Sequence, residues 1–184
     1  MMNTHFSFYK RPISNTIPYK SITVGDAYRV IKGNYFRKQT LQLRQLTDKS
    51  EASKFKRSNF HYATFSGVFE KRHESALVRH SGLIVFDFDG VEDVQRLRNM
   101  LISDSELETA LLFVSPSGNG IKWVVEIDLQ LGTHQQFYDG IKNYLESSYS
   151  IKRLDKSGRD VARACFLPHD PEVYINPKFV ENDK

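Results

Sequence analysis

The spacing of hydrophobic residues after position 82 most constrains the fold of this chain of 184 residues. Short apolar runs bounded by turn residues predict strands, and apolar residues spaced three or four apart predict helices. The two patterns alternate in the order strand, helix, strand, strand, helix, strand, over residues 82–90, 91–101, 110–115, 121–127, 133–148 and 161–167. The sequence therefore predicts an α+β domain built around one sheet.

This order of elements is that of the ferredoxin-like, or RRM-like, β-α-β-β-α-β fold. We expect an antiparallel sheet with the strand order 4-1-3-2, in which the end of the first strand lies beside the beginnings of the third and fourth. Three polar segments are then predicted to meet at one edge of the sheet: residues 86–90, 116–122 and 154–160.

The first part of the chain has a less regular pattern. We expect an extended segment, two short helices and a polar junction, over residues 6–9, 26–32, 35–46 and 47–59. The next segment, HYATFSGVF, favours a strand or tight turn that leads into the main sheet. The predicted division is a basic α/β N-terminal extension, residues 1–59, followed by a sheet domain, residues 60–184.

Positive and negative charges are divided unevenly along the chain. Residues 1–80 hold 15 Lys and Arg against 5 Asp and Glu, whereas residues 81–184 hold 11 against 17. A basic segment favours contact with a polyanion, because each phosphate that Lys or Arg neutralises releases condensed counterions. A solvated basic surface is the alternative interpretation. We favour nucleic-acid contact for the first half and a divalent-metal site for the second.

Cysteine content and hydropathy limit the cellular setting. The chain holds one cysteine, Cys165, so an internal disulfide is excluded, and its Cys and His residues lack the spacing of a zinc site. The first residues lack the apolar core of a signal peptide, and no apolar stretch has the length of a membrane span. The sequence therefore favours a soluble protein of the reducing cytoplasm.

Asp87 and Asp89 lie inside the first predicted strand of the sheet. Side chains two residues apart on a strand point the same way, so both carboxylates project from one face, opposite Phe86 and Phe88. Neighbouring anions repel unless a cation lies between them, and Mg²⁺ or Mn²⁺ binds such oxygen ligands. The alternative is structural, with one aspartate in a turn at Gly90 and the other capping the next helix. A cap, however, explains only one of the two carboxylates.

The connection between the second and third predicted strands contains a candidate phosphate-binding loop, formed by Ser117, Gly118, Asn119 and Gly120. Glycines allow backbone N–H groups to approach a phosphate, and Lys122, two residues into the strand, adds a cation. Alternation along the strand places Lys122 on the same face as the aspartates. The loop also suits an ordinary hairpin turn, and its expected position opposite Asp87 is what favours phosphate binding.

A charged run before the fourth predicted strand supplies two more candidates. Asp155 completes a set of three carboxylates for a metal, and Arg163 can bind a triphosphate through its planar guanidinium. A solvated charged loop is the alternative for this run. For His169 we favour a place in a turn over a catalytic role, because nothing in the sequence fixes the direction of its side chain.

In this order, the motifs resemble those of the archaeo-eukaryotic primase superfamily, and more closely its VirE N-terminal-type domains. That superfamily carries a hydrophobic strand with D-x-D or D-x-E, a small-residue motif that ends in histidine, and a hydrophobic-Asp motif followed by arginine. The matching segments here are Ile84–Asp89, Ser117–Lys122 and Leu154–Asp155 with Arg163, within a resemblance that covers roughly residues 60–178. The sequence departs from the pattern at Lys122, which stands where the superfamily has histidine; a lysine can still contact phosphate as a point charge.

The resemblance implies a primase-polymerase, a nucleotidyltransferase that acts in the replication of DNA, plasmids or mobile elements. It implies Mg²⁺ or Mn²⁺ held by Asp87, Asp89 and Asp155, with Lys122 and Arg163 neutralising the triphosphate. The implied partners are a DNA template and primer along the basic half, nucleoside triphosphates, and a helicase domain in the same or another chain. No membrane partner is expected.

Two other functions remain open at this stage. The VFDFDG segment is close to the nucleophile motif of haloacid-dehalogenase-like phosphatases. Those enzymes need parallel strands, which the short connection between the second and third predicted strands disfavours. The other alternative is a DNA-binding module of a replication or mobilisation protein that keeps the basic half but has no turnover.

Overall fold

The computed structural model describes residues 4–151, 154 and 156–180. Their helices are α1 (Val24–Lys32), α2 (Arg37–Gln45), α3 (Lys49–Asn59), α4 (Val94–Ile102) and α5 (His134–Tyr149), with short 3₁₀-helices η1 (Glu74–Ala76), η2 (Lys156–Arg159) and η3 (Pro177–Phe179). Their strands are β1 (Phe6–Tyr9), β2 (Lys20–Ile22), β3 (Tyr62–Thr64), β4 (Gly67–Phe69), β5 (Leu77–His80), β6 (Leu83–Asp89), β7 (Thr109–Val114), β8 (Gly120–Glu126), β9 (Cys165–Phe166) and β10 (Tyr174–Ile175). The fold is mixed α/β with antiparallel sheets.

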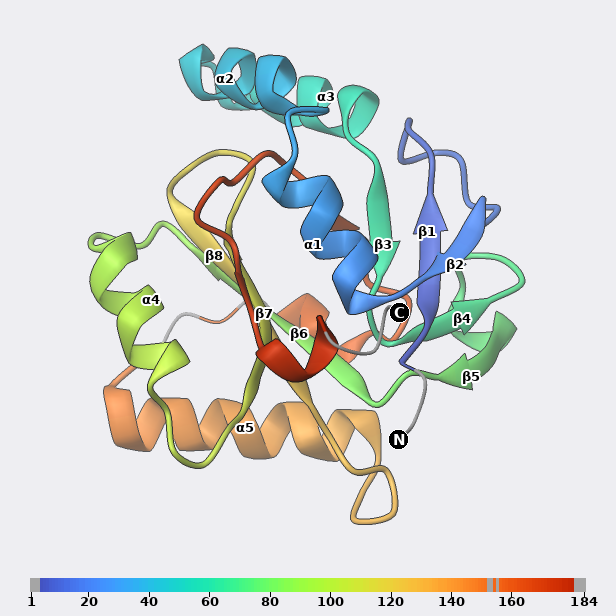
Figure 1. Ribbon diagram of the computed structural model, residues 1–184, viewed down its shortest axis with the longest axis vertical. Coiled ribbons are helices and arrows are strands. Elements are labelled where there is room, and N and C mark those ends of the chain that lie inside the picture. Colours follow the sequence, from blue (N-terminus) through green and yellow to red (C-terminus); the bar gives the residue numbers. More distant parts are fainter. Residues whose placement is uncertain (1–3, 152–153, 155, 181–184) are drawn as a thin grey trace.

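The main sheet has the strand order β10-β7-β8-β6; β6, β7 and β8 are labelled in Figure 1. β6, β7 and β8 correspond to the first three predicted strands of the sheet, and they pair in the predicted order. β6 pairs with β8 over its whole length, so Asp87 lies directly opposite Lys122, and Asp89 opposite Gly120. This register brings two of the three candidate segments side by side.

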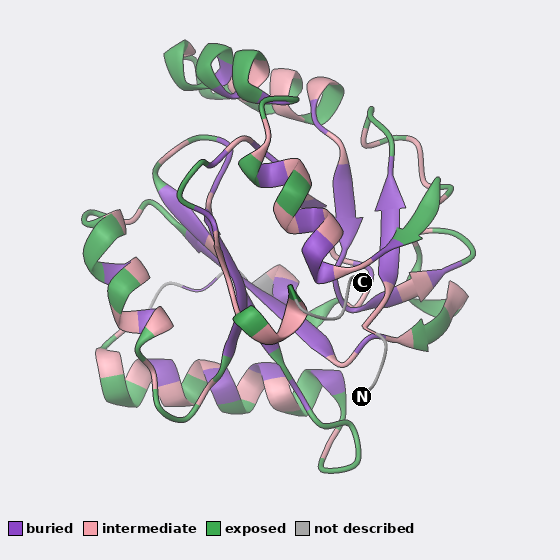
Figure 2. Cartoon of the chain, viewed as in Figure 1, coloured by how far each residue is buried: buried purple, intermediate pink, exposed green. Residues whose placement is uncertain are grey.

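Hydrophobic side chains cover both faces of the main sheet. Phe86, Phe88 and Trp123 point to one face, where they share a core with α4 and α5. Val85 and Val124 point to the other face, in a core that includes residues of α1, β1 and β3. Figure 2 shows these strands as buried, between helices on either side. The face that carries Asp87 is therefore largely closed by the N-terminal part of the chain.

A second sheet has the order β2-β1-β3-β9 and joins segments far apart in the sequence. The strand predicted over residues 161–167 was assigned to the wrong sheet. Its ordered part, β9, holds only Cys165 and Phe166, and it pairs with β3 rather than with β6. Cys165 and Leu167 are buried in the core below the second sheet, and this burial favours pairing with β3.

The place beside β6 where the fourth strand was expected is taken by η2. A Cβ atom on Gly158 of η2 would lie 3.0 Å from the Val85 carbonyl oxygen and 2.8 Å from the Tyr138 ring. Only glycine allows such a close approach without displacing its neighbours. The main sheet therefore differs from the predicted strand order at this edge, and β10 is added to its other edge, beside β7.

Side-chain caps mark where two helices of the N-terminal part, α1 and α3, begin. α1 starts after Thr23, which forms a capping box with Asp26, and it ends at Gly33, close to the predicted range. The junction predicted over residues 47–59 was wrong, because most of it is α3. Asp48 caps this helix by accepting a hydrogen bond from the Glu51 N–H at 2.8 Å.

The boundary predicted between residues 59 and 60 falls between α3 and β3. Strands from both sides of it share the second sheet, and residues from both sides share one core. Among the described residues, no helix has the length and apolar character of a membrane span.

Candidate functional site

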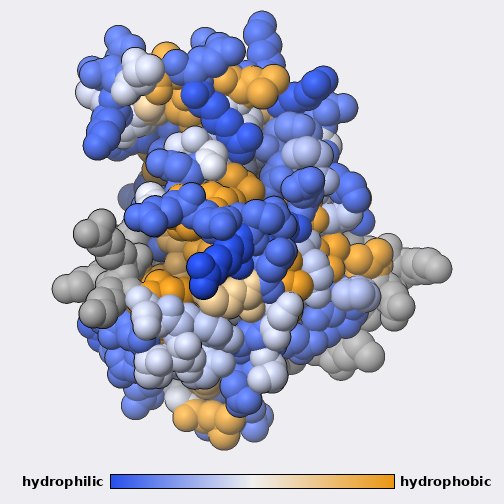
Figure 3. Space-filling model, turned by 90° about the vertical axis from the view of Figure 1, so that its left-hand side faces the viewer, coloured by the Kyte–Doolittle hydropathy of each residue, from blue (hydrophilic) through white to orange (hydrophobic). Residues whose placement is uncertain are grey.

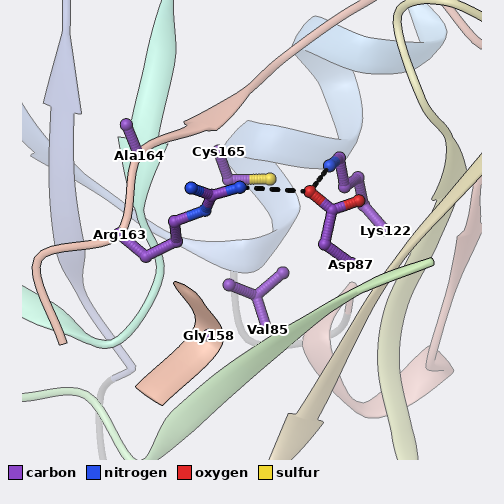
Figure 4. Close-up of a pocket in the computed structure, with 7 residues that line it drawn as sticks. All are labelled: Val85, Asp87, Lys122, Gly158, Arg163, Ala164 and Cys165. Atoms are coloured by element: carbon purple, nitrogen blue, oxygen red, sulfur yellow. Dashed lines mark hydrogen bonds and ion pairs between the residues drawn. The ribbon is translucent and has the colours of Figure 1, made fainter. Parts of the chain in front are cut away.

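Asp87 lies near the end of β6 and is 7% exposed. Its Oδ2 atom forms an ion pair with Lys122 and lies 3.4 Å from the Arg163 guanidinium (Figure 4). Lys122 reaches Asp87 because the two residues are directly opposite in the β6–β8 register, whereas Arg163 comes from the segment before β9. A buried carboxylate is thus held between two cations, which offsets much of the free energy needed to bury its charge.

The other carboxylate oxygen of Asp87, Oδ1, has a different environment. It is buried, and no described residue donates a hydrogen bond to it. A buried polar atom without a partner costs free energy, which a bound water or cation recovers. This oxygen is therefore a candidate ligand atom for a water or a cation.

Asp87 borders an open cleft of about 350 Å³, here called the Asp87 cleft. Its acidic groups are Asp87, Asp89 and Asp160, and its basic groups come from several parts of the chain: Lys56, Arg57, Arg72, Lys122 and Arg163. Carboxylates suit a divalent cation, and basic side chains suit phosphate oxygens. The lining therefore fits a metal–polyphosphate ligand better than an uncharged one.

The predicted phosphate loop is a tight hairpin turn between β7 and β8. The Ser115 N–H donates to the Gly120 carbonyl at 2.8 Å, and the Gly118 N–H donates to the Ser115 carbonyl at 2.9 Å. Gly118 has a φ of +87°, and a Cβ atom on Gly120 would lie 2.4 Å from the Phe88 carbonyl oxygen. Gly118 is therefore required by the turn and Gly120 by its close approach to β6, which agrees with the structural alternative that the sequence left open.

A second open cleft, of about 370 Å³, lies between this hairpin and the α2–α3 pair, and we call it the glycine-loop cleft. Ser117 and Asn119 line it, whereas Lys122 and Arg163 line the Asp87 cleft. Of the remaining predicted residues, Gly118 packs against Arg44, and Gly120 is buried beside β6. The structure thus divides the predicted nucleotide-binding residues between two clefts.

Arg44 of α2 joins the helix pair to the hairpin. Its guanidinium donates hydrogen bonds to the carbonyl oxygens of Ser115 and Pro116, each at 3.4 Å. Burial lowers the pKa of Arg44, an effect that the negative charge of Asp170 opposes. These contacts set the distance between α2 and the hairpin, and thereby the width of the glycine-loop cleft.

Lys56 of α3 lines both clefts. Burial, followed by the positive charge of Lys122, lowers the pKa of Lys56, whereas Asp89 and Asp87 act in the opposite direction. A cation that has lost solvent and has another cation nearby is stabilised by a bound anion. The sequence did not identify Lys56 as a site residue, because α3 was not predicted from it. The Asp48-x-x-Glu51 spacing is the signal that would have revealed this helix.

The third predicted carboxylate, Asp155, lies outside the described residues. Within the described part of the chain, no three His, Cys, Asp or Glu side chains are grouped so that they could hold a metal ion. Asp87 and Asp89 still fit Mg²⁺, which is commonly held by one or two carboxylates while water and substrate phosphates fill its other positions. The unpartnered Asp87 Oδ1 supplies one such ligand atom.

His169 has a structural environment and lines neither cleft. Its Nδ1 atom lies 2.8 Å from the Gly33 carbonyl oxygen, and its backbone N–H donates to Thr40 Oγ1 at 2.9 Å. These contacts hold the segment after β9 against the end of α1 and against α2. The turn interpretation of His169 agrees with this environment.

Comparison with known proteins gives one match. The model of the family described as "BT4734-like, N-terminal domain" matches residues 54–175, which include both aspartates of β6 and the glycine hairpin. No curated protein matches the chain, and no solved structure matches it. Because the matched segment covers well over half of its length, the chain belongs to the BT4734-like N-terminal domain family.

Proposed function

We propose that this chain is a metal-dependent nucleotidyltransferase of the primase-polymerase type. Its catalytic unit is a variant of the ferredoxin-like sheet, within residues 60–184, in which η2 takes the place of the fourth strand. The observation that carries the proposal is the buried Asp87 carboxylate, which has an unpartnered oxygen and borders a cleft lined by five basic side chains. The motif resemblance to primases supports the same conclusion.

In this proposal Asp87 and Asp89 hold Mg²⁺ or Mn²⁺, with Asp155 as a third ligand. The bound ion supplies activation of a 3′-hydroxyl and stabilisation of the leaving pyrophosphate. Lys122 and Arg163 neutralise Asp87 before the ion binds. With an ion at Asp87, Lys122 and Arg163 would be placed to contact the triphosphate, and Lys122 would stand in for the histidine of the superfamily.

The proposed partners follow from the charge of the clefts. Nucleoside triphosphates occupy the Asp87 cleft, where Lys56, Arg57 and Arg72 add to the positive charge. A DNA template and primer lie along the basic N-terminal half, and a helicase domain in the same or another chain opens the duplex. The setting is the replication of DNA, plasmids or mobile elements in the cytoplasm.

The test is primer synthesis and extension by the purified chain with Mg²⁺ or Mn²⁺. Asp89→Asn is the main variant, because Asp89 is exposed and the change leaves the buried ion pair intact. We expect it to lower the rate of nucleotide incorporation by about 100-fold or more, as for loss of a group that stabilises transition-state charge. Asp87→Asn should have at least as large an effect.

Glu146→Ala is the control, because Glu146 pairs with Lys142 on α5 and lines neither cleft. It should retain the rate of the unmodified chain. Equal rates for the unmodified chain and Asp89→Asn, or metal-independent incorporation, would remove the catalytic proposal.

A non-catalytic DNA-binding module is the second candidate, and one contact favours it. The Lys122 ammonium already neutralises Asp87, as a resident cation would in a site that has lost its metal. Titration of a nucleoside triphosphate with and without Mg²⁺ separates the two. DNA binding combined with no metal-dependent nucleotide binding would favour the module. The antiparallel pairing of β6, β7 and β8 removes the parallel arrangement that a phosphatase would need.

A further inference from the structure

The two clefts meet along α3. Ser53, Lys56 and Asp89 line both of them, so the clefts are two parts of one groove that runs between α3 and the end of the main sheet. At one end the groove reaches Arg163, and at the other it passes between the glycine hairpin and α2. A ligand that fills the Asp87 cleft can therefore extend into the glycine-loop cleft without leaving the protein surface.

α3 has an unusual relation to the rest of the protein, because none of its residues is buried. Lys49, Ser53 and Lys56 are spaced four and three residues apart, so they share one face of the helix, and this face lines the glycine-loop cleft. The α2–α3 end of the molecule is mostly hydrophilic on the side shown in Figure 3. The helix therefore presents polar and basic groups to the groove, while Ala52 and Phe55 pack against the small core of Phe36, Leu43 and Phe60.

The lining of the glycine-loop cleft suits phosphate groups. Its basic residues are Arg44, Lys49 and Lys56, against the single acidic residue Asp89, and Ser53, Ser117 and Asn119 add hydroxyl and amide groups. None of the described residues that line it is aromatic, so it offers no ring on which a base could stack. Its volume of about 370 Å³ lies within the range of nucleotide-sized sites.

We propose that the glycine-loop cleft is a phosphodiester-binding subsite that holds the backbone of the nucleic-acid strand whose 3′ end reaches Asp89. This inference rests on the proposed nucleotidyl transfer, and it assigns the acceptor strand to a surface distinct from the one that holds the triphosphate. Binding through phosphates and without stacking makes the contact independent of base sequence and sensitive to salt.

Three basic residues of α3 make the test possible. Lys49 lines only the glycine-loop cleft, Arg57 lines only the Asp87 cleft, and Lys54 lines neither. All three are exposed, and each change to alanine removes one positive charge from the same helix. The three variants have the same net charge. Any difference in binding among them therefore depends on where the lost charge was located.

Binding of a short fluorescent single-stranded oligothymidylate to the full chain is measured by anisotropy over a range of salt concentrations. Lys49→Ala should weaken binding about fivefold and lower the slope of log Kd against log salt by about 0.7, the value for one lost phosphate contact on a single strand. Lys54→Ala should leave both quantities unchanged. An oligoadenylate of equal length should show the same loss.

Binding of a nucleoside triphosphate with Mg²⁺ is measured on the same proteins. Arg57→Ala should weaken it, and Lys49→Ala should not. Two results would overturn the subsite. One is that Lys49→Ala and Lys54→Ala weaken oligonucleotide binding equally; the other is that Lys49→Ala weakens triphosphate binding but not oligonucleotide binding. If oligonucleotide binding follows the expected pattern but the unmodified chain incorporates no nucleotide, nucleotidyl transfer fails and the subsite stands.

Discussion

At the scale of single residues, the Asp87–Lys122 pair connects stability to the proposed chemistry. The side chains of Asp87 and Lys122 are 9% and 12% exposed, so both charges are largely removed from water. Each charge depends on the other, because an unpaired charge in such a place costs several kcal/mol. In the proposed function, the same desolvation would strengthen the attraction between the site and a metal ion with its anionic ligand.

Removal of the negative charge at this position should destabilise the protein. Asp87→Asn keeps the shape of the side chain but leaves Lys122 and Arg163 without their shared anion, so we expect the free energy of unfolding to fall by about 2–3 kcal/mol. Urea denaturation measures the change. Glu146→Ala, which breaks an ion pair of partly exposed side chains, should lower it by less than about 0.5 kcal/mol. A loss for Asp87→Asn no larger than that of Glu146→Ala would show that the pair adds nothing to stability.

At the scale of secondary-structure elements, the hairpin between β7 and β8 fixes the geometry of both clefts. Gly120 lies against the backbone of β6 directly opposite Asp89, so the hairpin and the acidic strand are held at one fixed distance. Arg44 holds the other side of the hairpin to α2. The glycines of this segment thus have a function even where they contact no ligand, because they determine how closely three elements approach.

Two glycines of the chain provide opposite outcomes for the same substitution. Gly120→Ala places a Cβ atom 2.4 Å from the Phe88 carbonyl oxygen, so the strands must separate, and we expect a loss of about 2 kcal/mol or more. Gly140→Ala, inside α5 with no atom near its Cβ position, should stabilise by about 0.5–1 kcal/mol. Thermal unfolding of both variants tests the argument, and equal melting temperatures would contradict it.

Elements with a strong local pattern could be predicted from the sequence, and elements decided by distant contacts could not. The apolar run of β6 and the helical spacing of α5 gave nearly correct ranges. α3 was not predicted, because its apolar contacts are limited to Ala52 and Phe55 and the rest of the helix is polar; its Asp48 cap is the signal that would have revealed it. β9 was assigned to the wrong sheet because its partner, β3, is about a hundred residues away.

The same distinction applies to the candidate site. Asp87, Asp89 and Lys122 could be placed together because strand alternation and register depend on local geometry. The basic lining from Lys56, Arg57 and Arg72 could not be foreseen, because it depends on how the N-terminal helices and loops pack against the sheet. Asp155 and its part in the metal site stay a prediction.

At the scale of the whole molecule, neutral histidines lie where separate parts of the chain meet. His80 of β5 accepts a hydrogen bond from the Gly82 N–H at Nδ1, so its Nε2 atom carries the proton that it donates to His134 Nδ1 at 3.1 Å. His134 in turn donates from Nε2 to the Gly158 carbonyl at 3.0 Å. This chain of hydrogen bonds joins β5, α5 and η2, and it exists only while both rings are neutral.

Stability should therefore fall in mild acid. Burial, followed by the positive charge that His134 can acquire, lowers the pKa of His80 to about 4, and burial followed by Arg11 lowers that of His61 to about 4. The unfolded chain takes up these protons near pH 6.5, so the contribution of the two histidines to the free energy of unfolding falls as the pH drops from about 6.5, and this contribution levels off below about 4.

Urea denaturation across this pH interval measures the effect. His80→Gln should reduce the slope, and it keeps an acceptor for the Gly82 N–H. His73→Gln, at an exposed turn, is the matched control substitution. The carboxylates titrate alike in all of these proteins. The difference in slope between the unmodified chain and His80→Gln therefore reports the contribution of His80 alone. Identical slopes in the unmodified chain and His80→Gln would rule out the His80 contribution.

The pairing of β3 with β9 has a consequence for how the protein is made. The open edge of β3 appears early during synthesis on the ribosome, but the residues that cover it, Cys165 and Phe166, are added about a hundred residues later. Until then the nascent chain exposes an uncovered strand edge of the kind that recruits chaperones or pairs with other chains. Truncation anywhere before Cys165 removes the strand that covers this edge, so the second sheet can be completed only after both of its distant segments have been made.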